Sequence, residues 1–484
     1  MTESLMSFSS LSQALGASLF AGEGKQAMQS EGFSSVAIDS RTVRPGALFV
    51  ALRGNALDGH KFVNAAFEAG ASAAMVAEAA AFDPVFDLIN LARKWNRVII
   101  AVENTLKALQ NAAGAYLKQF SNLVRIGITG SSGKTTTKEI AAAIIGQEKS
   151  VVMNKGNLNS ETGLPLSVFD VRPHHQVGIF EAGMNRKEEI AELARVLDPS
   201  LALITNIGSA HIGILGSRQA IAEEKKKIFS RFSGKNTALI PESDDYRDFL
   251  ADGVNGRVVF YGPSSLGACT HGVLSAHGPL GGIRDMGLRG TEIVWEGEAV
   301  RFGLPGKFNL ANALAAAALA QEMRLTAASI RCGLESVKPL FGRGEILYGR
   351  TTVIRDCYNA NPESVEEALE FCDSLEWQGR KIYVIGSMLE LGDSSEKAHA
   401  DLGRRLLSCK AGAIFLFGEE TQAAAEIIKR ERRDLLFLYT KDRDELSVAV
   451  DGCVKSGDMV LLKGSRGCEL ETLSGMLLGE SHVS

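Results

Sequence analysis

The chain has 484 residues, a formal net charge of −5 and 45% hydrophobic residues. This length predicts about three domains of roughly 100 to 200 residues each, and the slight negative charge without a long basic run argues against nucleic-acid binding. The seven cysteines form no C-x-x-C pair, so neither a disulfide framework nor a zinc ribbon is expected. A reducing cytoplasm is the simplest setting for such cysteines. Because the N-terminus is polar and no apolar run approaches about 20 residues, the sequence predicts a soluble protein without a membrane span.

Residues 1–104 are predicted to form a small α/β module. Short strands are expected at 36–39, 47–52, 72–76 and 97–102, with a helix at 62–69. Ser40 and Arg41 follow the first of these strands, where a hydroxyl and a guanidinium can bind phosphate. A turn-stabilising serine and a solvated arginine are the stronger local alternative, so the residues alone leave this role open.

A second domain is predicted over 105–340, beginning with a connecting helix at 105–120. Strands and helices then alternate, which is the pattern of a parallel sheet. The expected strands are 124–129, 151–154, 176–181 and 201–206, and the expected helices are 136–147 and 187–197. In open sheets of this kind, side chains at the carboxyl ends of the strands face the crevice that binds ligands.

A Gly/Ser-rich loop with Lys134 and Thr135 follows the first of these strands and opens a helix. Small residues let consecutive backbone N–H groups surround an anion, while the lysine can reach phosphate and the threonine hydroxyl can hold Mg²⁺. The general pattern would begin with a glycine at Ile128, so only its shorter form is present, and a plain linking turn is the alternative. The predicted phosphate-binding residues are Thr129, Gly130, Ser131, Ser132, Gly133, Lys134, Thr135 and Thr136.

Two further polar side chains come at or after strand ends. Glu181 ends an apolar strand, as does the Walker-B acid that holds Mg²⁺; an N-cap or surface acid is the alternative. His211 follows the strand at 201–206 and could ligate a metal through a neutral imidazole nitrogen. A loop histidine without a metal is equally open.

The helix expected at 218–232 carries one lysine on its apolar side. Lys225 shares the stripe of Ile221, Ala222, Ile228 and Phe229, whereas Glu223, Glu224 and Lys227 are expected to face outward. Burial lowers the pKa of a lysine and favours the neutral amine needed for modification or base chemistry. Snorkelling of the amine to solvent is the alternative.

A hairpin is expected at 291–304, and Asn309 and Asn312 then lie at the head of an Ala-rich helix that ends near residue 323. A third alternating block is predicted over 341–484. Its strands are expected at 352–356, 381–385, 413–417 and 460–462, and its helices at 363–375 and 396–407. Loops after these strands, at 358–362, 386–392 and 463–466, would present ligand groups.

Together these motifs resemble the ATP-dependent Mur ligases of peptidoglycan synthesis, over nearly the whole chain. Asp39-Ser-Arg41, the run 45–52 and Asp58-Gly-His60 resemble the UDP-binding module of the members that add the third and the final peptide units. The loops at 358–362, 388–392 and 463–466 are similar to those of the D-alanyl-D-alanine-adding members. The D-N-P-R loop of the diaminopimelate-adding members is absent from the sequence.

The resemblance implies a three-domain α/β fold: a UDP-binding module, a central P-loop ATPase-like parallel sheet, and a C-terminal Rossmann-like domain that binds D-alanyl-D-alanine. It implies ATP and two Mg²⁺ ions as cofactors. The implied metal ligands are Thr135, Glu181, His211 and a carbamoylated Lys225. The implied catalytic residues are Lys134, Glu181, His211 and Lys225. The implied nucleotide contacts beyond the loop are Asn309, Asn312, Arg343 and Asp356. The implied substrate contacts are Ser40, Arg41, Asn157, Asn159, Tyr358, Asn359 and Asn361.

The implied reaction begins with phosphoryl transfer from ATP to the terminal carboxylate of UDP-N-acetylmuramoyl-tripeptide. The amine of D-alanyl-D-alanine then attacks the acyl phosphate, and a monomer is expected to do this. The chain departs from the family pattern where Phe308, Ser160 and Ser387 replace the usual His, Asn and Asp. The alternatives are a folylpolyglutamate synthase or third-residue-adding ligase, which shares the central site, and a nucleotide-dependent switch, which would need no nucleotide contacts from a further domain.

Overall fold

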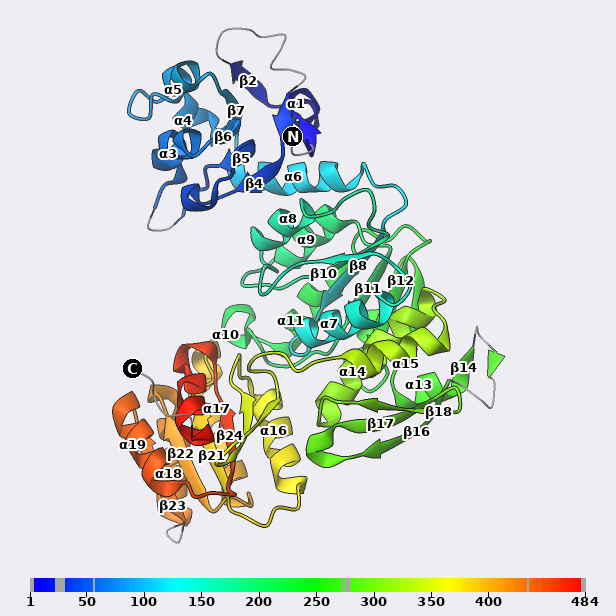
Figure 1. Cartoon of the computed structure of the whole chain (residues 1–484), viewed down its shortest axis with the longest axis vertical. Coiled ribbons are helices and arrows are strands. Elements are labelled where there is room, and N and C mark those ends of the chain that lie inside the picture. Colours follow the sequence, from blue (N-terminus) through cyan, green and yellow to red (C-terminus); the bar gives the residue numbers. More distant parts are fainter. Residues whose placement is uncertain are drawn as a thin grey trace.

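The computed structural model describes residues 4–21, 31–54, 57–270, 273–274, 279–432 and 435–479. Three large sheets follow one another along the chain, and Figure 1 shows an α/β lobe around each of them. The predicted three-domain α/β class is therefore confirmed, while the exact boundaries after residues 104 and 340 stay predictions. In the described part of the chain, no helix is long and apolar enough to cross a membrane.

The first lobe contains a five-stranded sheet. Its order is β2 (Ser18–Ala21), β7 (Val98–Val102), β6 (Ala73–Ala77), β5 (Ala47–Val50) and β4 (Ser35–Ala37). Only β2 runs antiparallel to its neighbour in this sheet. One face is covered by α3 (Val63–Glu68), α4 (Glu78–Ala81) and α5 (Leu88–Trp95). The four predicted strands and the helix α3 are confirmed to within two residues; β2, α4 and α5 were not predicted.

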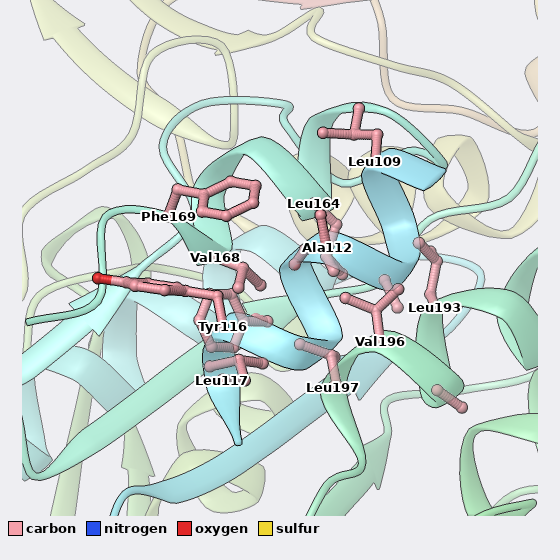
Figure 2. Close-up of a cluster of buried hydrophobic side chains, with 14 of the residues drawn as sticks. Leu109, Ala112, Tyr116, Leu117, Leu164, Val168, Phe169, Leu193, Val196 and Leu197 are labelled. Carbon is pink, nitrogen blue, oxygen red and sulfur yellow. The ribbon is translucent and has the colours of Figure 1, made fainter. Parts of the chain in front are cut away.

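The other face of this sheet packs against α6 (Thr105–Leu117), which also contacts the central domain. A single apolar cluster contains residues of the first sheet, of α1 (Phe8–Leu15) and of α6. Figure 2 shows that Leu109, Tyr116 and other side chains of α6 meet those of α8 (Gly163–Val168) and α9 (Glu189–Leu197). The Tyr116 hydroxyl also donates to the Val171 carbonyl at 2.7 Å. The helix predicted as a connector is thus a shared core element of two lobes.

The central lobe is built on a six-stranded, wholly parallel sheet. Its order is β13 (Arg257–Tyr261), β12 (Thr237–Pro241), β11 (Leu201–Ile204), β8 (Val124–Thr129), β10 (Val177–Glu181) and β9 (Val151–Met153). The chain moves from β8 to one side for β9 and β10 and then to the other side for β11. This change of direction is a topological switch point, where loops from neighbouring strands separate and leave room for a ligand.

Helices cover both faces of the central sheet. One face packs on α7 (Lys134–Ile145), α14 (Lys307–Glu322) and α15 (Ala327–Ser336), and the other on α9 and α11 (Arg218–Lys226). The predicted end of α11 at residue 232 is wrong, because the α-helix ends at Lys226 and a tighter 3-10 turn at Lys227–Phe229 follows it. The predicted hairpin is β17 (Thr291–Trp295) with β18 (Glu298–Phe302), and β16 (Leu280–Asp285) adds a third, unpredicted strand.

The third lobe has a six-stranded sheet in which only β19 is antiparallel to its neighbour. Its order is β19 (Glu345–Tyr348), β20 (Thr352–Asp356), β24 (Met459–Lys463), β21 (Lys381–Gly386), β22 (Ala413–Phe417) and β23 (Leu436–Thr440). The helices α16 (Pro362–Ser374), α17 (Ser395–Leu407) and α18 (Gln422–Glu431) cover one face, and α19 (Arg443–Cys453) and α20 (Ser474–Leu478) cover the other. The four predicted strands and two predicted helices are confirmed; the two outermost strands and α18 to α20 were not predicted.

Candidate active site

A cleft of about 680 Å³ lies between the carboxyl edge of the central sheet and the third lobe. Its walls come from the loops after β8, β10, β11 and β20 and from the start of α14. The predicted residues that line it are Ser131, Ser132, Gly133, Lys134, Thr135, Thr136, Asn157, Asn159, Glu181, His211, Asn309, Asn312, Arg343, Asp356, Tyr358, Asn359 and Asn361. The predicted residues outside this lining are Ser40, Arg41, Thr129, Gly130 and Lys225.

The phosphate loop has the backbone shape that its glycines permit. Gly130 and Gly133 have φ values of 152° and 78°, and a Cβ on Gly133 would collide with the Asn312 carboxamide. The α7 helix begins at Lys134, and no side chain among the described residues caps it. Its first N–H groups and its positive dipole end are therefore available to an anion in the cleft.

Lys134 folds back over the loop in this structure. Its Nζ donates to the Gly130 carbonyl at 2.9 Å. Burial lowers the pKa of the Lys134 amine, and the nearby Glu181 carboxylate opposes that effect. An incoming phosphate would favour the charged amine in the same way that Glu181 does.

Residues at the end of β11 hold the phosphate loop in place. The Asn206 Oδ1 atom accepts from the backbone N–H groups of Ser131 and Ser132 at 3.1 and 2.9 Å, and the Thr205 hydroxyl donates to the Ser132 carbonyl at 2.6 Å. Thr129 is fully buried, and its hydroxyl donates to the Ala182 carbonyl at 2.8 Å. The roles of Thr205 and Asn206 were not predicted, although both ended a predicted strand.

Glu181 is the centre of an oxygen-rich cluster beside the loop. It is only 1% exposed, and its two carboxylate oxygens accept from the Thr135 hydroxyl at 2.7 Å and from Asn159 Nδ2 at 2.6 Å. A carboxylate and a hydroxyl are ligands that suit Mg²⁺. Within the described ranges, no group of three His, Cys, Asp or Glu side chains could hold a metal. A Mg²⁺ ion here would therefore depend on this mixed donor pair and on oxygens of its substrate.

Lys225 lies beneath the phosphate loop. It is 1% exposed, among the buried residues of its stripe as predicted, and its Nζ donates to the Gly130 carbonyl at 2.8 Å. Burial lowers the pKa of Lys225 well below its ordinary value, and the neighbouring Lys134 lowers it further. The expectation for Glu224 is wrong: this side chain is buried, accepts from the Ile190 N–H and pairs with Lys227. A carboxylate can be buried there because both contacts compensate its charge.

The loop after β11 contacts the third lobe through two side chains. Ser209 donates from its backbone N–H and its hydroxyl to the Glu363 carboxylate at 2.9 and 2.8 Å. His211 has a left-handed backbone, and its Nδ1 lies 3.0 Å from the Glu390 carboxylate, whose pKa it lowers. Glu363 and Glu390 were not assigned roles from the sequence: Glu363 was predicted to start a helix, and Glu390 lay in the loop at 386–392 predicted to present ligand groups.

One end of the cleft has an unsatisfied amide oxygen. Asn309 is buried and its Nδ2 donates to the Pro305 carbonyl at 2.8 Å, but its Oδ1 has no hydrogen-bond partner among the described residues. The Asn312 Oδ1 accepts from the Thr137 hydroxyl at 3.1 Å. A buried acceptor without a partner is costly and therefore suits a ligand with an N–H donor.

The third lobe supplies charged groups opposite the loop. The Arg343 guanidinium lies 4.0 Å from the centre of the Tyr358 ring. Asp356 pairs with Lys463 at 2.8 Å, and Lys463 also donates to the Asn359 carbonyl at 3.0 Å. The sequence placed Lys463 in a ligand loop without giving it a role, and it is here a buried part of the cleft wall.

The loop after β20 also shapes the start of α16. The Asn359 Oδ1 accepts from the Ala360 N–H, and the Asn361 Oδ1 accepts from the Ser364 N–H as a helix cap, both at 2.8 Å. Farther along α16, burial raises the pKa of Glu367 to about 7, against the opposing effect of Lys463.

The polar motifs of the first lobe contact their own neighbours in the sequence. Arg41 pairs with Asp39 at 2.5 Å and its side chain is 87% exposed, while Ser40 begins a 3-10 turn. His60 is buried, with Nδ1 at 2.5 Å from the Asp58 carboxylate and Nε2 accepting from the Ala77 N–H at 2.9 Å. These contacts agree with the local alternative of a turn serine and a solvated arginine.

Family models match three successive parts of the chain. They are the Mur ligase family, catalytic domain, over 32–117, the Mur ligase middle domain over 128–320, and the Mur ligase, glutamate ligase domain, over 342–466. A UDP-N-acetylmuramoyl-tripeptide--D-alanyl-D-alanine ligase of Treponema pallidum is 42% identical over 449 residues, which cover 93% of this chain and 95% of that protein. The chain belongs to the Mur ligase family.

Other Mur ligases resemble this one over similar lengths. A protein of the same name from Bacillus subtilis is 34% identical, covering 90% of this chain and 92% of its own. A crystal structure of MurF from Acinetobacter baumannii has a TM-score of 0.83 and 27% identity, and covers 98% of both chains. MurF from Thermotoga maritima in complex with ADP has a TM-score of 0.77 and 28% identity, covering 92% of this chain and 97% of that one. The predicted family is confirmed, and the chain is a Mur ligase of three domains.

Proposed function

We propose that this Mur ligase uses ATP to join D-alanyl-D-alanine to UDP-N-acetylmuramoyl-tripeptide during synthesis of the peptidoglycan precursor. The observation that carries the proposal is the cleft, in which a phosphate loop and the Thr135–Glu181 pair face charged groups of the third lobe. The names of the Treponema and Bacillus relatives support the choice of substrates. We expect a cytoplasmic enzyme that acts as a monomer.

ATP would bind with its phosphates at the start of α7. Lys134 and the free N–H groups of the helix would contact the phosphates, and Asn309 would accept a hydrogen bond from the adenine amino group through its unpaired Oδ1. Asn312 would lie nearby. Arg343 and Asp356 would contact the nucleotide from the third lobe, the carboxylate at the ribose hydroxyls. Binding through two lobes would hold them together around the reactants.

The donor set fits Mg²⁺, with Thr135, Glu181, His211 and a modified Lys225 as the proposed ligands of two ions. Bound Mg²⁺ would supply positive charge to the phosphate oxygens. Lys134 would stabilise the charge that develops as the terminal carboxylate of the tripeptide attacks the γ-phosphorus and ADP leaves. The acyl phosphate is then attacked by the amine of D-alanyl-D-alanine, which gives the amide and inorganic phosphate.

Carbamoylation of Lys225 is the finer part of the proposal. Its burial and lowered pKa favour the neutral amine, which can add to CO₂ with loss of one proton to give a carbamate anion. The amine lies at the Gly130 carbonyl, on the underside of the loop that would hold the phosphates. A carbamate extends the side chain by three heavy atoms and turns a cation into an anion, which suits a metal ligand.

The substrates would enter from opposite lobes. Ser40 and Arg41 of the first lobe would bind the uridine diphosphate, with the Arg41 guanidinium released from Asp39 to pair with phosphate. Asn157 and Asn159 would meet the muramoyl part beside Glu181. Tyr358, Asn359 and Asn361 would position D-alanyl-D-alanine, and the closed cleft would exclude water from the acyl phosphate.

A product assay tests this function. The purified protein is incubated with ATP, Mg²⁺, UDP-N-acetylmuramoyl-tripeptide and D-alanyl-D-alanine, and the mass of the nucleotide product is measured with each component omitted in turn. We expect addition of one dipeptide for each ATP consumed. Product formation only with UDP-N-acetylmuramoyl-dipeptide and a diamino acid would instead identify a third-residue-adding ligase. Product formation only with a folate and glutamate would identify a folylpolyglutamate synthase. ATP binding without any product would favour the nucleotide-dependent switch.

A further inference from the structure

Lys138 is a fully buried lysine that the proposed reaction does not use. It lies on α7 one turn after Lys134, with 0% of its side chain exposed. Its Nζ donates to the Asn154 carbonyl at 2.6 Å and lies 3.3 Å from the Glu139 carboxylate, which is 28% exposed. Because a buried ammonium is costly unless its contacts compensate it, the Asn154 carbonyl is a strong and specific partner.

Asn154 connects this lysine to two strands. It is fully buried just after β9, and its Oδ1 accepts from the Glu181 backbone N–H at 2.9 Å. Its Nδ2 donates to the carbonyls of Leu158 at 2.8 Å and of Glu181 at 3.1 Å. The carboxamide therefore holds the end of β10 on one side and the loop at 155–159 on the other, while Lys138 fixes its backbone from α7.

The loop at 155–159 brings two side chains to the cleft. Asn157 and Asn159 both line it, and Asn159 donates to Glu181 at 2.6 Å while its carbonyl accepts from the Gly183 N–H at 2.8 Å. Lys138 does not belong to the described residues that line the cleft. Within the described part of the chain, its hydrogen bond to this wall is the one to Asn154.

We propose that Lys138 is a positioning residue for the UDP-linked substrate. Its ammonium ties Asn154 to α7, and Asn154 holds the loop at 155–159 so that Asn157 and Asn159 face that substrate. The substrate part of this inference rests on the proposed function. ATP affinity depends mainly on other groups, because Lys134 is held by Gly130 and the phosphate loop is held by Thr205 and Asn206.

The third lobe offers a matched control. Lys381 is also buried, and its Nζ donates to the carbonyls of Cys372 at 2.8 Å and Leu375 at 2.5 Å. Among the described residues, its amine donates to carbonyls at the end of α16 and just after it, and none of these residues lines the cleft. Lys381→Met therefore removes a buried ammonium with carbonyl partners but leaves the loop at 155–159 untouched.

Hydrogen exchange and steady-state kinetics together test the proposal. In Lys138→Met we expect amide exchange at 155–160 to rise about tenfold or more and the KM for the UDP-tripeptide to rise about tenfold, because a charge-assisted hydrogen bond is lost. The KM for ATP should stay within about twofold. Lys381→Met should change neither the exchange at 155–160 nor either KM, whatever it does to the melting temperature. If Lys138→Met does not fold, Lys138→Gln keeps a smaller polar group and carries the same expectation.

Unchanged exchange at 155–160, or an unchanged KM for the UDP-tripeptide, overturns the proposal. An equal rise of both KM values also overturns it, because that result means general damage to the central lobe. The exchange measurement needs no turnover. If the wild-type protein forms no product, the proposed function fails, while exchange still decides whether Lys138 holds the loop.

Discussion

The cleft and the first lobe both carry short polar motifs after strand ends, but their side chains find different partners. In the cleft, Thr135 contacts Glu181 and Ser209 contacts Glu363, so each contact joins separate loops or lobes. In the first lobe, Asp39 pairs with Arg41 and Asp58 with His60, two residues along in each case. The cleft is therefore assembled from distant residues before any substrate binds, whereas Arg41 must leave Asp39 to bind one.

This difference predicts a division of labour between the two regions. Substitutions at the proposed phosphate, metal and nucleotide contacts of the cleft should reduce the chemical step or the affinity for ATP, because the reacting phosphates lie there. Substitutions in the first lobe should change the affinity for the UDP-linked substrate alone. The predictions below run from the largest expected effect to the smallest.

Lys134→Ala should lower kcat by about a thousandfold, because the phosphates lose the amine that stabilises their developing charge. The melting temperature should change little, since the side chain contributes little packing to the core. Phosphate release and product mass give the rate, and calorimetry gives the melting temperature. Lys118→Ala, at an exposed lysine of the same lobe, is the control. A folded Lys134→Ala variant with near-normal ligation would contradict the assignment of the cleft as the site of the reaction.

Lys225→Ala should lower kcat by about a hundredfold, because the proposed carbamate anion is lost. If the missing group is an anion, acetate should partly restore product formation and methylamine should not. The rates are measured with and without each additive at constant ionic strength. Restoration by methylamine alone would mean that Lys225 works as a cation or a base.

Arg343→Ala and Arg41→Ala compare the two regions directly. Arg343→Ala should raise the KM for ATP about tenfold, as expected for loss of a charge-assisted contact, and leave the KM for the UDP-tripeptide unchanged. Arg41→Ala should show the reverse pattern. Initial rates at varied concentrations of each substrate separate the two. The division of labour fails if Arg41→Ala raises the KM for ATP, or if Arg343→Ala leaves the KM for ATP unchanged.

Glu367→Gln should give a smaller, pH-dependent effect on stability. Burial raises the pKa of Glu367 from 4.5 to about 7 in the folded chain. A folded chain that binds this proton more tightly loses stability as the pH rises through that interval. The unfolding free energy of the variant minus that of the wild type should therefore increase by about 1 kcal/mol when the pH is raised from 5 to 8. This value is reduced because the side chain is partly exposed. Urea denaturation at both pH values measures it. Glu370→Gln, at an exposed position, should show no such gain.

Local sequence patterns predicted most of the elements that form the cleft. The phosphate loop and Glu181 were identifiable because an apolar strand precedes each polar residue, and parallel strands bring their carboxyl ends to one edge. The apolar stripe of α11 likewise predicted the burial of Lys225. The outer strands β19, β23 and β2 were missed because they are short or carry weak alternation between apolar and polar residues.

The partners of these residues could not be predicted, because they depend on how lobes pack. Glu363 in the first turn of α16 looks like an ordinary helix-start acid until Ser209 of another lobe meets it. Glu224 looks like part of a solvated charge run until Lys227 and the Ile190 N–H compensate it. Lys138 gives no signal at all, since a single lysine after a phosphate loop usually faces solvent.

Transfer of an oxygen isotope tests the central claim most directly. The UDP-tripeptide is labelled with ¹⁸O in its terminal carboxylate and is converted with ATP and D-alanyl-D-alanine. If the carboxylate attacks the γ-phosphate in the cleft, one labelled oxygen leaves with the phosphate when the amine displaces it, so inorganic phosphate should carry one ¹⁸O atom for each amide formed. Product formation with unlabelled phosphate would contradict the acyl-phosphate route and the role given to the cleft.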